Sequence, residues 1–125
     1  MSGLNPVQRT MRALREQGSI CEKVERWNPY GGAGHGIRQD LLGIIDILVL
    51  DPERGVVGIQ ACGQSTASHI RKLTIEKSQE SIDWLSTPGT SLEIWCWRQI
   101  KLKRGGKAMR WQAKVTPITL EEHFK

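Results

Sequence analysis

Two apolar runs that follow each other closely constrain the fold of this chain most strongly. The runs LLGIIDILVL (41–50) and VVGIQAC (56–62) are joined by DPERG, in which Asp-Pro and Gly favour a tight connection. Continuous apolar runs of this kind are typical of strands buried inside a sheet. The pair therefore predicts a β-hairpin near the centre of a sheet, with one acid, Asp46, and one amide, Gln60, among its apolar residues.

The flanking segments predict the other regular elements. A helix is expected over 4–19, a strand over 20–27, a Gly-rich loop over 28–36, a helix over 68–86, and a second hairpin over 91–100 and 108–118. The resulting order, α-β-β-β-α-β-β, predicts one α/β domain over residues 1–125, with helices packed on a central mixed sheet. We expect Trp84, Trp95 and Trp111 in the core or at an interface.

Size and composition narrow the class of protein. A chain of 125 residues that is 38% hydrophobic can bury a core, and it contains no leader pattern and no apolar run of about 18 residues. We therefore expect a cytoplasmic protein with no membrane contact. Three widely spaced cysteines favour reduced thiols over a disulfide framework. The loop GGAGHG lacks the Lys-Ser/Thr ending of a phosphate-binding loop, so no nucleotide cofactor is expected.

Positive charge is concentrated in the second hairpin. The net charge is +5, and the segment 98–114 holds seven basic residues and no acid, which leaves 11 basic against 13 acidic residues elsewhere. Such a segment either neutralises nucleic-acid phosphates or simply keeps the hairpin solvated. Under the first interpretation, DNA contacts are expected at the hairpin tip and on the first helix: Lys101, Lys103, Arg104, Lys107, Arg12 and Arg15.

Asp46 needs an explanation because an ionised carboxylate is costly to bury without a partner. Together with the Gln60 side chain and the Ala61 carbonyl, it could form the oxygen-rich site that Mg²⁺ or Mn²⁺ prefers. The alternative is that Asp46 lies at a strand end and bonds to the backbone or to water.

The order of elements, with an acid on the second strand and a polar pair spaced by two on the third, resembles the PD-(D/E)xK nuclease superfamily. The segments ERWNPYGGAGHGIRQDLLGIIDILVLD, GVVGIQACGQSTASHIRKL, EIWCWRQ and RWQAKVTPITLEEHF are similar to small phage and bacterial nucleases related to Holliday-junction resolvases. The similarity covers nearly the whole chain. It implies a restriction-endonuclease-like core and metal-dependent hydrolysis of DNA, including branched DNA, by a homodimer.

The resemblance places Asp46 at the metal-binding acid of the second strand. Gln60 then stands where the family has the Glu of its E-x-K motif, and Cys62 stands where it has the Lys. This is a marked departure, because Gln carries no charge and a thiol cannot replace an ammonium beside the transition state.

Other residues could compensate for these losses. The resemblance suggests Lys72 as a lysine that reaches the site from the following helix, Asp40 as a second acid, and Glu16 or Glu25 as a further carboxylate. The simpler roles are that Asp40 stabilises a turn and that Lys72 faces DNA or solvent.

The junction after the third strand is a further candidate phosphate contact. Gln64, Ser65 and His69 lie there, at the entry to the helix, although a Ser or Thr in this position also serves as an ordinary helix cap. The resulting expectation is a metal-dependent DNA endonuclease. The alternatives are a nuclease-fold protein that binds DNA without cleaving it, and a protein-interaction module that uses the basic hairpin.

Overall fold

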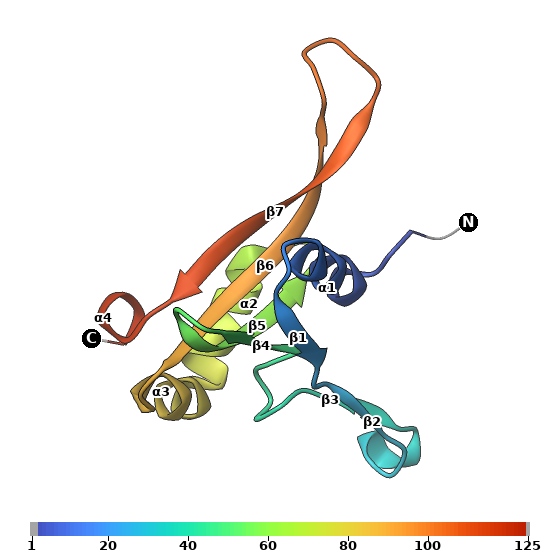
Figure 1. The fold of residues 1–125 in the computed structure, drawn as a ribbon. Helices are drawn as coiled ribbons and strands as arrows, with labels where there is room; N and C mark the ends of the chain where they lie inside the picture. The colour runs from blue at the N-terminus through green and yellow to red at the C-terminus, as the bar shows by residue number, and fades with distance from the viewer. Residues whose placement is uncertain (1–2, 125) are drawn as a thin grey trace.

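The computed structural model describes residues 3–124 as an α/β fold built on a mixed sheet (Figure 1). The strands are β1 (Ile20–Lys23), β2 (Arg26–Asn28), β3 (Ile37–Gln39), β4 (Ile47–Asp51), β5 (Gly55–Cys62), β6 (Thr90–Lys101) and β7 (Met109–Ile118). The helices are α1 (Pro6–Glu16), α2 (Thr66–Arg71), α3 (Ser78–Ser86) and α4 (Leu120–His123). Five strands form the sheet in the order β1-β4-β5-β6-β7, and of its pairings only β5–β6 is parallel. The predicted α/β class and central mixed sheet are confirmed.

Helix α1 covers one face of the sheet. Asn5 and Gln8 form a reciprocal capping box at its start, and Pro6 occupies the first turn, where its missing N–H costs nothing. Leu14 is buried against Ile47 and Val57 and their neighbours on β4 and β5. The predicted first helix is therefore confirmed, and it forms a layer of its own.

The opposite face is covered by the chain between β5 and β6. Leu73 packs there with Ile44 and Ile94, and Trp84 of α3 lies over Gly58. A Cβ at Gly58 would come within 2.6 Å of the Ile45 side chain and 3.2 Å of the Trp84 ring, so glycine is what lets this layer approach the sheet.

The strand expected over 20–27 is divided in the structure. Pairing with β4 stops at Lys23 opposite Ile47, because β4 begins there. The chain then leaves the sheet and forms β2, which pairs with β3 in a separate two-stranded hairpin that projects from the sheet (Figure 1). We call residues 26–39 the flap.

The first half of the run 41–50 is also not a strand. Leu41 and Ile45 exchange backbone hydrogen bonds around a tight turn, in which Leu42 and Gly43 have positive φ values of 56° and 75°. Only Ile47–Asp51 forms β4. Asp46 therefore lies directly before a strand rather than inside one. This placement agrees with the alternative that put Asp46 at a strand end.

The helix expected over 68–86 is interrupted. It starts at Thr66, passes through a π-helical turn at Lys72–Glu76, and resumes as α3 after Lys77. The Lys77 N–H donates to the Lys72 carbonyl at 2.7 Å, which is the i→i+5 bond of a π-turn.

Strands β6 and β7 continue beyond the sheet as a two-stranded arm. Pairing with β5 ends at Cys96, whereas β6 and β7 stay paired out to Lys101 opposite Met109 (Figure 1). The expected second hairpin is confirmed. Trp111 is not in the core: it is 43% exposed on the arm, with the Arg9 guanidinium 3.9 Å from its ring centroid.

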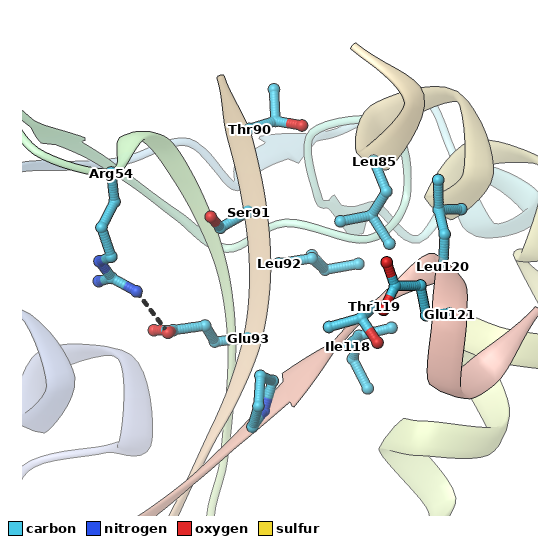
Figure 2. A pocket seen from close by; sticks show the side chains of 11 residues that line it. Arg54, Leu85, Thr90, Ser91, Leu92, Glu93, Ile118, Thr119, Leu120 and Glu121 are labelled. Carbon is cyan, nitrogen blue, oxygen red and sulfur yellow. Dashed lines mark hydrogen bonds and ion pairs between the residues drawn. The ribbon is translucent and has the colours of Figure 1, made fainter. Parts of the chain in front are cut away.

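Near the start of β6, a half-buried ion pair lies beside a hollow of about 390 Å³ (Figure 2). The Glu93 side chain on β6 accepts from Arg54 at 2.7 Å and from the Trp95 indole at 3.0 Å. Within residues 3–124, no helix combines the length and the apolar character needed to cross a membrane.

Candidate metal centre

Three carboxylates meet where the flap joins the sheet. Glu25 directly precedes β2, Asp40 directly follows β3, and Asp46 directly precedes β4. One carboxylate oxygen from each lies within 4.8 Å of the other two. The tight turn 41–45 reverses the chain between Asp40 and Asp46, so it brings these two acids together although neither belongs to a strand.

Asp46 is the most buried of the three acids, with 6% of its surface exposed. One of its oxygens accepts from the Ala61 N–H at 2.9 Å, which ties it to β5. Burial, reinforced by the hydrogen bond and the negative charge of Asp40, raises the pKa of Asp46 to about 8. A cation bound here would relieve the same repulsion.

Asp40 has a different environment, because a lysine reaches it. Burial raises its pKa, but the hydrogen bond from Asp46 and the charge of Lys72 outweigh burial, so the pKa of Asp40 is lowered overall. Lys72 Nζ lies 3.3 Å from Asp40 Oδ2. The lysine suggested on the helix therefore does contact the acidic cluster.

Gln60 joins the carboxylates to His69. Its Nε2 donates to Asp40 at 3.2 Å and to Asp46 at 3.4 Å, while its Oε1 lies 3.4 Å from His69 Nδ1. A bound cation would need the oxygen on the carboxylate side, which requires a half-turn of the amide. Burial, and then the charge of Lys72, lower the pKa of His69. The neutral imidazole can donate or accept at Nδ1, so it suits both amide orientations.

Cys62 does not compensate for the missing lysine. It is buried opposite Cys96, and burial together with the hydrogen bond to Cys96 raises the pKa of the Cys62 thiol to about 12. A neutral thiol packed in the core supplies no positive charge. Lys72 is the ammonium at this centre.

The remaining sequence candidates are spread around the molecule. Gln64 and Ser65 are exposed at the start of α2, and the Ser65 side chain makes no cap hydrogen bond, contrary to the cap interpretation. Arg12, Arg15 and Glu16 lie on α1, across the sheet from the carboxylates, where Arg12 pairs with Glu16 at 3.2 Å. Glu25, rather than Glu16, is thus the third carboxylate.

The cations of the arm fall into two groups. Strand register places Arg98, Arg110 and Lys114 on the sheet face that carries Gln60, because Lys114 is opposite Cys96 and Cys96 is beside Cys62. The four residues expected to contact DNA are exposed at or near the tip: Lys101, Lys103, Arg104 and Lys107.

Sequence reasoning missed three further cations beside the centre. Arg26 and Arg38 lie on the flap, and Lys77 follows the π-turn; Arg38 lies 3.8 Å from Glu25. Nothing in their local patterns marks them, because their proximity depends on the flap and the π-turn.

In comparisons with protein-family models, curated proteins and solved structures, none matched this chain. What the centre can do is therefore inferred from its own chemistry. A divalent cation fits this donor set, since three clustered carboxylates supply hard oxygen ligands, and burial and the charge of Asp40 raise the pKa of Asp46.

Proposed function

We propose that the chain is a metal-dependent nuclease that hydrolyses phosphodiester bonds in DNA, and that its sheet is a restriction-endonuclease-like core. The observation that carries the proposal is the cluster of Glu25, Asp40 and Asp46 with the Lys72 ammonium in contact. The position of Asp46 and the order of the elements agree with the PD-(D/E)xK resemblance. Under this proposal, Glu25 and Lys72 compensate for the missing Glu and Lys of E-x-K.

The roles of the residues follow from their placement. Glu25, Asp40 and Asp46 would hold Mg²⁺ or Mn²⁺, with Gln60 as a further oxygen ligand after its amide turns. A bound divalent ion polarises a phosphate and lowers the pKa of a water molecule. Lys72 Nζ would offset negative charge that develops on the phosphate, since it already lies beside the carboxylates.

The basic face of the arm supports DNA as the substrate. Lys114, Arg98 and Arg110 are exposed on the face that carries Gln60, so the charge leads outward from the metal centre. The paired part of the arm beyond Cys96 contains five residues of each strand, which corresponds to a reach of about 17 Å. The exposed tip lysines and arginine extend this surface.

The test is cleavage of linear, single-stranded and four-way-junction DNA with Mg²⁺ or Mn²⁺. Asp46→Asn keeps the shape of the side chain and an acceptor for the Ala61 N–H but removes the charge. Asp51→Asn is the matched control, because it makes the same change at the other end of β4. We expect cleavage by the wild type and by the control, and a loss of at least about a thousandfold in Asp46→Asn.

Binding without cleavage is the second candidate function. It is favoured by Gln60, whose amide nitrogen rather than oxygen faces the carboxylates, and by the neutral thiol of Cys62. Salt-sensitive retardation of DNA with no metal-dependent cleavage would support this candidate. If the protein neither cleaves nor retards DNA, both candidate functions are contradicted, and the protein-interaction module is favoured.

A further inference from the structure

A basic cavity of about 700 Å³ adjoins the metal centre, between the flap and the π-turn. Its charged lining consists of Arg26, Arg38, Lys72, Lys77 and Asp40. We infer that this cavity, which we call the clamp, binds a backbone phosphate of the substrate next to the phosphate at the metal centre. The inference rests on the proposed function, and it adds a phosphate site that the resemblance does not supply.

The π-turn is what brings both lysines to the clamp. In an α-helix each residue turns about 100°, so side chains five positions apart diverge by about 140°. The bond from the Lys77 N–H to the Lys72 carbonyl closes a wider turn, which places one residue nearly above the other. Both lysines consequently line the same cavity, although an uninterrupted helix would separate them.

Lys77 also lies across the turn that joins Asp40 to Asp46. A Cβ at Gly43 would come within 3.2 Å of Lys77 Cε and 3.3 Å of Nζ, so the bare glycine leaves room for the ammonium end of the lysine. Gly43 has a φ of 75°, which also favours glycine at this position. The turn that assembles the carboxylates therefore positions a cation beside them.

The flap supplies the opposite wall. Arg26 and Arg38 lie at its base, next to Glu25 and Asp40. Trp27 packs against Gly36, where a Cβ would clash with the indole ring, so the two strands of the flap hold each other in place. The arginines are thus presented from a short paired segment rather than from a loose loop.

The charge of the clamp selects an anion. Asp40 is the only acid among the described lining residues, and Lys72 already pairs with it. Arg38 lies 3.8 Å from Glu25, which does not line the cavity, so Arg26 and Lys77 are the cations in excess. The volume lies within the range of about 300–1,000 Å³ found for ligand sites. Because Lys72 and Asp40 belong both to the clamp and to the metal centre, an anion bound here would lie directly beside the one at the metal.

The test measures binding of a 30-base-pair duplex by fluorescence anisotropy, in EDTA and in Ca²⁺, over a range of salt concentrations. Lys77→Gln is the principal variant, since it touches none of the three carboxylates. Arg71→Gln removes the same charge from an exposed position of α2 that does not line the clamp, and Lys77→Arg keeps the charge. Thermal unfolding of each variant checks that the fold is retained.

We expect Lys77→Gln to weaken binding several-fold at low salt and to reduce the slope of log K against log salt by about 1, as loss of one phosphate contact should. Arg71→Gln and Lys77→Arg should stay close to the wild type. Duplexes with single neutral methylphosphonate linkages then locate the contact. One linkage near the cleavage point should weaken the wild type and leave Lys77→Gln unaffected.

The outcomes separate this inference from the proposed function. If the wild type binds and cleaves DNA but Lys77→Gln keeps the wild-type affinity and salt slope, the clamp is wrong and the nuclease stands. If Lys77→Gln responds to every methylphosphonate as the wild type does, the phosphate contact is likewise contradicted. If the wild type binds no DNA, both proposals fall.

Discussion

Two buried carboxylates, on opposite faces of the sheet, are stabilised in different ways. Glu93 pairs with Arg54 at 2.7 Å (Figure 2), and it also accepts a hydrogen bond from the Trp95 indole. Asp46 is matched by neutral donors and faces two other acids, so burial and Asp40 raise its pKa to about 8. The first carboxylate is satisfied within the fold, whereas the second retains a need for a cation. The contrast distinguishes a structural acid from a candidate ligand.

The largest expected effect of a substitution is on the rate of DNA cleavage. We predict that Lys72→Met lowers DNA cleavage by about a hundredfold, or ~2.7 kcal/mol, because it removes the ammonium beside the centre. Arg71→Met, at the preceding and exposed position of α2, is the control and should change the rate little. Equal rates for the two variants, measured in single-turnover assays, would assign Lys72 a merely electrostatic surface role.

The next largest expected effect is on the free energy of unfolding, and it concerns Glu93. Arg54→Met leaves Glu93 buried without its cation, and we expect the free energy of unfolding to fall by about 2 kcal/mol. Adding Glu93→Gln should recover much of this loss, because the uncompensated charge is gone. Urea unfolding of the single and double variants measures both steps. A double variant no more stable than Arg54→Met would show that the pair is not coupled in this way.

The pH dependence of stability should distinguish the two carboxylates. The folded state keeps the Asp46 proton up to about pH 8, while the unfolded chain loses it near pH 4, so this group's contribution to stability is present below pH 4 and lost as the pH rises to 8. We expect the free energy of unfolding to decline across this window. Asp46→Asn should flatten the profile, and Glu93→Gln should leave the decline in place, as urea unfolding at each pH would reveal.

The smallest effect is metal stabilisation. At ten times the dissociation constant, Mg²⁺ should raise the free energy of unfolding by about 1.4 kcal/mol at pH 8. The gain should vanish in Asp46→Asn and Glu25→Gln and persist in Glu93→Gln. Thermal unfolding with and without Mg²⁺ measures it. A gain that survives in Asp46→Asn would place the ion elsewhere.

Local patterns made much of the fold predictable. The capping residues of α1, the turn DPERG and the alternating residues of β6 and β7 each encode their element over a few neighbouring positions. Asp46 and Gln60 were found because polar residues stand out within apolar runs, whereas Asp40 was suggested by the resemblance. Hydrogen bonds from Gln60 to both acids bring the three residues together.

The rest depends on tertiary structure. The strand over 20–27 divides because its partner β4 begins at Ile47, and no local signal reports where a partner begins. The choice of Glu25 over Glu16 follows from the layers, since α1 lies on the far side of the sheet. The π-turn, which contains the buried Leu73, departs from helical spacing, so the position of Lys77 could not be inferred from that spacing.

The flap has one more consequence, which concerns how two binding events affect each other. Glu25 and Asp40 stand at the two ends of the flap, so the backbone that carries its arginines also fixes the separation of two of the three carboxylates. A ligand that orders the flap at the clamp therefore also orders the carboxylates of the metal centre, and a cation at the metal centre orders the arginines of the clamp. Thermodynamic linkage makes such coupling reciprocal. If a cation at the metal centre raises the affinity of the clamp for an anion, the anion raises the affinity of the metal centre for the cation by the same factor.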